Sequence, residues 1–573
     1  MSEHRRPEHD PTVVLPAVDP DATVVLPAVP PTVVPGEEAT ASVTRNSAVM
    51  AVGSLASRLT GFVRTVAIGA AIGAKAFSDD YTLANTLPNM VYELLLGGVL
   101  ASVVVPLLVR ARTRDADRGE AYAQRLLSAA TIFLAGATVF AVLLAPAFTE
   151  LLAHSSSGVN KHLITVFGYL LLPEIFFYGI AALLAAVLNT RGHFAAPMWT
   201  PILNNIVVIA TAGAFIMIWS NARELGPAKV TMGQVLVLGV GTTLGIVVQA
   251  AGLFPALRKV GFHWRWRLDW RELRLRELGR VGGWMLGYVV VSQIALLVVL
   301  ALAQAAGKHN GPGPMVFNNA YLIFMMAHGI VAVSIITALL PRMSAAAAEH
   351  RYGDVATQLS LGTRLSAVIL IPATALYVVL GRQLGVALFE FRSYGHDDAV
   401  ATGWVIAAAG LGLVPFAISQ LQIFAFYALT DTRTPALLNV PVAALRIVID
   451  VALYAALTAG AVAAGLMVGN AVSFLAACVI GYWLLRRRLG PLGLTQVGGT
   501  LLRLGAAALI AAVPALLVAL ILEHFIGLGK LASIVELAVA GLVLVAVYLA
   551  AAVGLRVREV SDVWGMVRSR VAR

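Results

Sequence analysis

Long apolar segments recur along most of this 573-residue chain and limit its fold more than any other feature. Between about Ser47 and Val553, apolar runs of about 20–30 residues alternate with short polar breaks. An α-helix needs roughly 20 apolar residues to cross the hydrocarbon core of a bilayer. Only 12% of the residues are charged, whereas soluble domains carry about 25%. The sequence therefore predicts an all-α, polytopic membrane protein.

Fourteen of these segments are predicted to span the membrane, as two six-helix lobes followed by two extra C-terminal helices. The predicted spans are residues 46–73, 81–109, 126–153, 162–188, 197–219, 230–256, 281–305, 315–341, 362–388, 398–427, 434–457, 461–485, 499–522 and 531–555. The expected parts are a disordered Pro-rich cytoplasmic tail (1–43), an N-lobe (44–257), a basic interfacial linker (258–280), a C-lobe (281–485), a two-helix extension (486–555) and a basic cytoplasmic tail (556–573).

The Lys and Arg residues between the predicted spans indicate an orientation. With the N-terminal tail in the cytoplasm, the cytoplasmic breaks and the C-terminal tail contain 25 of them, and the opposite side contains 8. Positive residues concentrate in cytoplasmic loops, and one missed span would scramble this contrast. We predict a multi-pass protein of the cytoplasmic (inner) membrane with both termini in the cytoplasm. The net charge of +11 is then assigned to anionic lipid headgroups rather than to nucleic acid.

The N-terminal tail contains a short repeat, seen in Pro11–Val18 and again in Ala22–Val29, and no apolar run typical of a signal peptide. Prolines at this density prevent regular structure, so we expect residues 1–43 to be disordered. Thr12 and Thr23 each have a Leu three residues later and acidic residues nearby. Phosphothreonine in this spacing is similar to ligands of forkhead-associated domains, which makes both threonines candidate phosphosites. The alternative is a low-complexity spacer.

The break between the sixth and seventh predicted spans is the longest basic one. Its segment Phe262–Trp270 combines Trp and Arg residues, as a segment at the membrane surface would. We interpret residues 258–280 as an interfacial linker between the lobes; a hinge or a lipid sensor is the alternative.

Two arginines lie inside the first predicted span, where a charge costs about 2.5–3.5 kcal/mol at the helix centre. Arg58 lies near mid-membrane with no acidic residue close in sequence, and Arg64 follows six residues later. Gly61 between them permits a bend, and Ser57 precedes Arg58. We interpret Ser57, Arg58 and Arg64 as substrate-binding, because guanidinium groups facing a cavity bind phosphate or pyrophosphate through forked hydrogen bonds. The alternative is that the arginines pair with acids elsewhere or extend to the interface.

The second predicted span carries further polar and helix-breaking residues. Asp79 lies at its outer start, Pro88 and Asn89 follow, and Glu93 lies deeper. We expect Asp79, Asn89 and Glu93 to contact substrate, and Glu93 to pair with a first-span arginine when substrate is absent. Acids at a helix N-terminus are also ordinary partners of the helix dipole. Pro88 and Pro106 are expected to bend or break this helix.

Other polar residues lie deep in later spans. Glu174, Asn204 and Asn205 either hold helices together or contact substrate. Arg446 and Asp450 stand four residues apart, so they can face each other on one helix. We interpret them as a structural pair, with a cation-coupling site as the alternative.

The sequence lacks the common motifs of catalytic and metal sites. We find no Gly-rich phosphate loop, no His, Asp and Glu cluster at metal spacing and no Ser-His-Asp arrangement. Cys478 is the only cysteine, which excludes a disulfide framework. We therefore expect neither an enzyme nor a bound cofactor or metal.

Several motifs resemble the MurJ (MviN) family of lipid II flippases, in the multidrug/oligosaccharidyl-lipid/polysaccharide exporter superfamily. They are Ser57–Arg64, Asp79, Leu87–Asn89 with Gly98, Val105–Pro106, and the junction from Leu188 to Pro201. The Pro-rich tail and the abundance of alanine resemble actinobacterial members.

This resemblance implies a fold of two six-helix lobes around a cationic cavity, with the last two helices forming a groove for the lipid tail. It implies that Arg58, Arg64 and Asp79 belong to the cavity. The chain departs from the family pattern where many members carry charged residues: it has Thr86, Tyr92 and Tyr321–Leu322 there. A less basic cavity is expected in consequence.

The function implied is alternating-access transfer of the peptidoglycan precursor lipid II, an undecaprenyl-pyrophosphate glycan, to the outer leaflet. The alternatives are a flippase for another polyprenyl-pyrophosphate-linked glycan and a non-transporting scaffold for cell-wall synthesis. A cationic-drug exporter would favour acidic residues at mid-membrane, and a membrane glycosyl- or acyltransferase needs an acid or His cluster.

Overall fold

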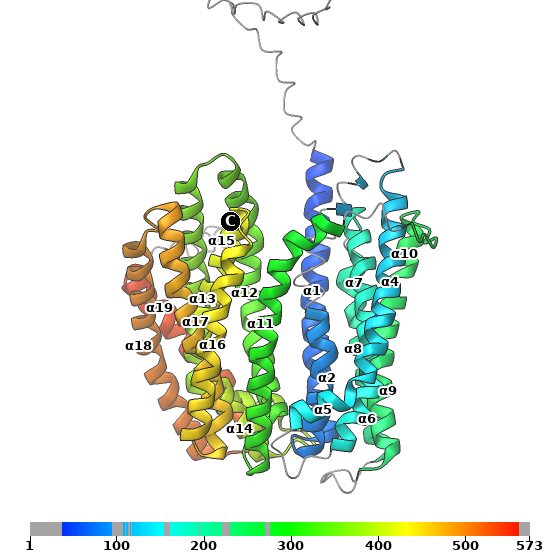
Figure 1. Ribbon diagram of the computed structural model, residues 1–573. Coiled ribbons are helices and arrows are strands. Elements are labelled where there is room, and N and C mark those ends of the chain that lie inside the picture. Colours follow the sequence, from blue (N-terminus) through cyan, green and yellow to red (C-terminus); the bar gives the residue numbers. More distant parts are fainter. Residues whose placement is uncertain are drawn as a thin grey trace, which may run out of the picture. The chain divides into compact units, whose positions relative to one another are not determined.

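The computed structural model describes residues 37–93, 107–108, 111–112, 115, 117–153, 161–193, 195–219, 230–269, 275–557 and 559–560. Within these residues the secondary structure is helical, apart from one isolated bridge between Phe391 and Tyr394. The helices are α1 (Glu37–Ile72), α2 (Ala76–Glu93), α4 (Glu120–Leu143), α5 (Ala145–Ala153), α6 (Lys161–Leu171), α7 (Glu174–Thr190), α8 (Ala195–Ile218), α9 (Met232–Ala251), α10 (Phe254–Lys259), α11 (Leu275–Lys308), α12 (Pro314–Ala348), α13 (Tyr352–Phe389), α14 (His396–Gly410), α15 (Leu413–Ala428), α16 (Arg433–Ala456), α17 (Ala459–Leu489), α18 (Leu494–Ile526) and α19 (Lys530–Gly554) (Figure 1).

Each predicted span overlaps at least one of these helices. In the described residues, 11 helices are long and apolar enough to cross a membrane, or 12 if the bent pair α14 and α15 forms one span. These helices confirm an all-α, polytopic membrane protein. Because α1 and α2 are not among them, the number of fourteen stays a prediction. The predicted division of 434–485 into two helices is confirmed, since α16 ends at Ala456 and α17 begins at Ala459.

Two helices begin inside segments that are predicted as a tail and a linker, and the domain boundaries stay a prediction. Helix α1 begins at Glu37, inside the predicted disordered tail, because no proline follows Pro35 and residues 37–43 contain good helix formers. Helix α11 begins at Leu275, inside the predicted linker. Internal contacts divide the chain into Met1–Val49 and Met50–Arg573. All of the contacts described below lie in the second unit.

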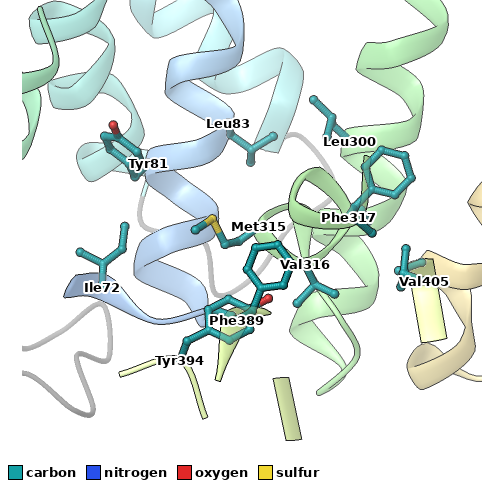
Figure 2. Close-up of a cluster of buried hydrophobic side chains, with 14 of the residues drawn as sticks. Ile72, Tyr81, Leu83, Leu300, Met315, Val316, Phe317, Phe389, Tyr394 and Val405 are labelled. Atoms are coloured by element: carbon teal, nitrogen blue, oxygen red, sulfur yellow. The ribbon is translucent and has the colours of Figure 1, made fainter. Parts of the chain in front are cut away.

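One large buried cluster joins α1 and α2 to helices of the predicted C-lobe. Figure 2 shows part of it, and its labelled members are Ile72, Tyr81, Leu83, Leu300, Met315, Val316, Phe317, Phe389, Tyr394 and Val405. Small residues let the backbones approach here. A Cβ at Gly73, where φ is +76°, would lie 2.8 Å from the Ser393 carbonyl oxygen. The Ser393 N–H donates to the Ala70 carbonyl oxygen at 3.4 Å. The cluster therefore packs the end of α1 against the segment after α13.

Helices α18 and α19 pack along α13 (Figure 1). Near one end, Arg382 of α13 donates to Glu523 of α18 at 3.1 and 2.5 Å. One residue on, Gln383 donates to the buried Glu536 of α19 at 2.9 Å. The Tyr548 hydroxyl donates to the α13 backbone at 2.9 Å. An unpaired polar group is costly in lipid, so breaking these bonds would be unfavourable. The bonds therefore attach the two-helix extension to α13.

The start of the predicted linker is held on α4. Gln124 donates to the His263 carbonyl oxygen at 2.7 Å, and the Arg267 N–H donates to the Ser128 hydroxyl at 3.0 Å. Arg125 pairs with Asp269 at 2.6 Å. These contacts make residues 260–269 an attached edge of the N-lobe, which argues against a freely moving hinge within that stretch.

Candidate functional site

Arg58 and Arg64 lie on one uninterrupted helix, because α1 continues through Gly61. The Arg58 guanidinium lies against α12: a Cβ added at Gly329 would overlap it. Glycine at 329 therefore makes the space that Arg58 occupies. Gly61 itself faces the Asn205 side chain of α8, because a Cβ added at Gly61 would lie 3.6 Å from the Asn205 amide nitrogen. Its predicted role as a hinge stays a prediction.

Arg64 lines a cavity of about 180 Å³, called here the central cavity. Its lining residues come from α1, α2, α7, α8, α9 and α12, and Arg64 is the one charged side chain among those described. The polar lining consists of Arg64, Thr65, Tyr81, Thr82, Asn85, Thr86, Asn89, Tyr178, Asn204, Thr242, Asn318 and Asn319. Amide and hydroxyl groups around one guanidinium can bind an anion that also carries hydroxyl or amide groups.

Neither arginine forms an ion pair with any carboxylate whose side chain the structure describes. The predicted partner Glu93 lies at the end of α2, and its side chain is outside the described residues. Glu174 of α7 is buried and accepts a hydrogen bond from Thr243 at 3.3 Å. It also lies within electrostatic range of Arg64. No described carboxylate is therefore ion-paired with either guanidinium group; Arg64 lines the central cavity, whereas Arg58 is not among its lining residues.

The adjacent residues Asn204 and Asn205 make different contacts. One matches the alternative of holding helices together, and the other matches the alternative of contacting substrate. Asn205 donates to the Ser57 carbonyl oxygen at 3.2 Å and to the Thr60 hydroxyl at 2.9 Å, so it holds α8 to α1. Asn204 lines the central cavity, and its side-chain oxygen has no hydrogen-bond partner among the described residues. Ser57, predicted to bind substrate, contributes its backbone carbonyl to the helix contact.

On α2, Asn89 lies in the central cavity, as a substrate contact requires. Its amide donates to the Asn85 carbonyl oxygen at 2.8 Å and accepts from the Tyr178 hydroxyl at 3.2 Å. Pro88, which lacks an N–H, lies within the same helix, and α2 continues through it. The hydrogen bonds fix the Asn89 side chain at the cavity wall.

Asp79 lies outside the residues that line the central cavity. Its buried carboxylate accepts a hydrogen bond from the Met315 N–H at 2.9 Å, in the first turn of α12. An anion is stabilised at a helix N-terminus by the unpaired N–H groups there. The structure therefore places Asp79 at a contact between α2 and the start of α12.

Three of the predicted residues lie outside the described residues: Pro106, Thr12 and Thr23. The sequence analysis in turn missed Asn318 and Asn319, although two amides in an apolar run are the same signal that singled out Asn204 and Asn205. It also missed Tyr81 and Tyr178, for which the sequence offers no comparable signal. Thr86 and Leu322, where the family pattern has charged residues, line the central cavity. This lining agrees with the expected weakly basic cavity.

Long apolar helices that enclose a polar cavity, with an arginine in its wall, define a multi-pass membrane protein with a polar interior site. The comparisons with known proteins identify which kind. The family model described as "Lipid II flippase MurJ" matches residues 68–539. The chain belongs to this family, which confirms the resemblance seen in the motifs and the expectation of a transporter rather than an enzyme.

Curated relatives agree with this assignment. The chain is 28% identical over 448 residues to the probable lipid II flippase MurJ of Rhizobium meliloti (strain 1021), covering 76% of this chain and 79% of the relative. It is 24% identical over 474 residues to the protein of that name from Synechocystis sp. (strain ATCC 27184 / PCC 6803 / Kazusa), covering 82% and 86%.

Solved structures agree on the fold. A lipid II flippase MurJ in an inward closed conformation has a TM-score of 0.68 at 16% identity, covering 88% of this chain and 97% of that chain. An inward-facing MATE family transporter of the MOP superfamily has a TM-score of 0.62 at 17% identity, covering 77% and 98%.

Proposed function

We propose that this protein moves lipid II from the inner to the outer leaflet of the cytoplasmic membrane by alternating access. The observation that carries this proposal is Arg64, a cation in the wall of a polar cavity with no described carboxylate paired to it. Membership in the family supports lipid II as the substrate.

The pyrophosphate of the substrate binds Arg58 and Arg64 in this mechanism. Both guanidinium groups offer forked donors that match phosphate oxygens. Asn89 and Asn204 add amide groups for the sugar hydroxyls. A volume of about 180 Å³ is below the roughly 300–1,000 Å³ of typical ligand sites. The helices around the cavity must therefore separate before the whole head group can enter.

The contacts between the two predicted lobes form the outer closure. They are the bond from Met315 to Asp79, the contact of Gly73 with Ser393 and the buried cluster of Figure 2. In the proposed orientation, with both termini cytoplasmic, these contacts lie at the outer ends of α1 and α2. Binding of the anion at the arginines lowers the cost of moving them, and opening to the outside requires the outer closure to break.

The proposed parts follow the predicted division into an N-lobe, a C-lobe and a two-helix extension. Helices α18 and α19 carry many exposed large apolar side chains, such as Leu509, Phe525 and Leu542. Such surfaces fit the undecaprenyl tail, which stays in lipid beside the extension while the head group crosses.

A flippase for another polyprenyl-pyrophosphate-linked glycan is the second candidate function. The observation in its favour is the weakly basic central cavity, where Thr86 and Leu322 replace charged residues of the family pattern.

The deciding experiment measures lipid II in the outer leaflet of cells depleted of this protein, using an added enzyme that cleaves exposed lipid II. We expect cleavage to fall while total lipid II rises. Wild-type protein restores cleavage, whereas Arg58→Ala and Arg58→Lys, present at normal amounts, do not. Unchanged exposure of lipid II on depletion would contradict lipid II as the substrate and favour the second candidate function. Full activity of both variants would remove the arginine mechanism.

We further propose that phosphorylated Thr12 or Thr23 binds a forkhead-associated domain. The support is the spacing of Leu three residues after each threonine, with acidic residues nearby. Phosphoproteomics of growing cells tests it, and the absence of phosphate on both threonines would refute it.

A further inference from the structure

A second, larger cavity lies inside the C-lobe. Its volume is about 690 Å³, and its lining residues come from α11, α12, α15, α16 and α17. This size is within the range of roughly 300–1,000 Å³ that ligand sites have. Asn318 and Leu322 of α12 line both this C-lobe cavity and the central cavity. The two cavities are therefore neighbours across α12.

The lining of the C-lobe cavity is mixed. Aromatic side chains such as Tyr321, Phe416 and Phe474 line it, together with amide and hydroxyl side chains such as Gln420, Asn439 and Ser473. Such a surface suits a ligand made of sugar and peptide groups, because aromatic faces pack on apolar patches while amides and hydroxyls exchange hydrogen bonds.

Arg446 is the one charged side chain among the described lining residues. It lies well inside α16, where an unpaired charge would be expensive. Its described ion-pair partner is Asp450, whose oxygen is 3.5 Å from the Arg446 Nε. That distance exceeds the roughly 2.7–3.2 Å of an N–H···O hydrogen bond. The pair therefore offsets the charge without a close bond between the two groups.

The two members of this pair have different surroundings. Asp450 is fully buried and does not line the cavity. Its carboxylate lies against Gly469 of α17, where an added Cβ would overlap it. Arg446 therefore presents the positive charge to the cavity, and the balancing negative charge lies behind it. Asp450 offsets the charge of Arg446 while the cavity holds no anion, and the guanidinium, which lines the cavity, can still donate hydrogen bonds to a bound carboxylate.

We propose that the C-lobe cavity is a second subsite for the transported head group, in which Arg446 binds a carboxylate of the peptide carried by that head group. This rests on the proposed function. The charge of Arg446 is partly offset by Asp450, so it matches a monovalent carboxylate better than a pyrophosphate. The more highly charged pyrophosphate matches the two arginines of α1. The shared wall at Asn318 and Leu322 lets one head group reach both subsites.

The test uses the full-length protein in lipid nanodiscs and two synthetic probes: lipid II with free peptide carboxylates, and the same molecule with those carboxylates amidated. Equilibrium binding of each probe is measured by native mass spectrometry. The wild-type protein is expected to prefer the free form by roughly ten- to hundredfold, as a charge-assisted hydrogen bond implies.

The informative variant is the double substitution Arg446→Gln with Asp450→Asn, because it removes both charges and leaves no buried ion unpaired. It is expected to bind the two probes equally, with the affinity of the wild type for the amidated form. Arg433→Gln, on the exposed start of the same helix, is the matched control and keeps the preference. Thermal unfolding of all three proteins checks their folding.

The outcomes separate the two proposals. Equal binding of both probes by the wild type, or a preference that survives in the double variant, overturns the C-lobe subsite. Failure of the wild type to bind either probe overturns the proposed substrate, and this inference with it. An Arg58→Ala protein that loses affinity for both probes equally supports separate subsites for pyrophosphate and carboxylate.

Discussion

At the scale of single residues, the position of Arg58 depends on a glycine of another helix. The Gly329 position of α12 leaves the space that the guanidinium fills, and an added methyl group would overlap it. We expect Gly329→Ala to displace Arg58 and to reduce lipid II exposure in complemented cells by roughly tenfold or more, the scale of one lost charge-assisted bond. The same assay with added cleaving enzyme measures this effect.

The control for this prediction is Gly287→Ala on α11, where an added Cβ meets nothing within 4 Å. It is expected to transport as the wild type does. Normal transport by Gly329→Ala would show that Arg58 need not occupy the place that the structure gives it.

Asn204 and Asn205 permit a second test, because one faces the central cavity and the other joins two helices. Asn205→Ala is expected to lower the free energy of unfolding by about 0.6–2 kcal/mol, the range for interhelical hydrogen bonds in membranes. Asn204→Ala is expected to leave stability unchanged and to weaken lipid II binding. Thermal unfolding and native mass spectrometry measure the two effects, and an exchange of the two results would reverse the assigned roles.

At the scale of elements, the membrane spans could be predicted and the roles of polar residues only in part. A bilayer sets the length of an apolar segment, so runs such as 434–457 and 461–485 predict α16 and α17 directly. Which side of a helix faces a cavity depends on packing against distant segments. That is why Asp79 was expected in the cavity but contacts the start of α12.

The same limit applies to the Arg446–Asp450 pair. Spacing on one helix predicts that the two residues are close, and the ion pair at 3.5 Å is consistent with the structural role. It does not predict that Arg446 lines a cavity, because that depends on how four other helices pack around α16. Sequence alone therefore assigned a pairing and missed a candidate site.

The linker segment on α4 makes a prediction about pH. The hydrogen bond from Arg125 holds the pKa of Asp269 below its usual range. A lowered pKa in the attached state means that ionised Asp269 stabilises attachment above its ordinary pKa of about 3.9. This stabilisation is lost as the pH falls through the lowered value. We expect attachment to be constant from pH 7 to pH 5 and to weaken below about pH 4.

Hydrogen exchange of the Arg267 N–H, which donates to Ser128, measures the attachment. Because the intrinsic exchange rate of an amide itself changes with pH, the protection of this N–H relative to that rate is compared at each pH. The control Asp269→Asn is expected to have lower protection at neutral pH and to show no further loss of protection on acidification. Wild-type protection that falls already between pH 7 and pH 5 would assign the attachment to another group.

At the scale of the whole molecule, transport by alternating access requires the outer closure to open. A Cβ at Gly73 would lie 3.7 Å from the Ser393 Cβ, within the roughly 3.5–4.5 Å that a disulfide spans. Cys478 is the only native cysteine and is buried. In a Cys478→Ala protein, two introduced cysteines can therefore pair only with each other. We expect Gly73→Cys with Ser393→Cys to form a cross-link under oxidation and to stop lipid II transfer.

Reduction is the internal control for this pair, because Gly73 has a φ of +76° and any side chain there is strained. Strain is present in both redox states, whereas the cross-link is present in one. Transfer that returns on reduction therefore assigns the block to the tether between α1 and the segment after α13. A fully cross-linked protein that still transfers lipid II at the wild-type rate would mean that the substrate crosses without separation of these two segments, and the alternating-access mechanism would have to be abandoned.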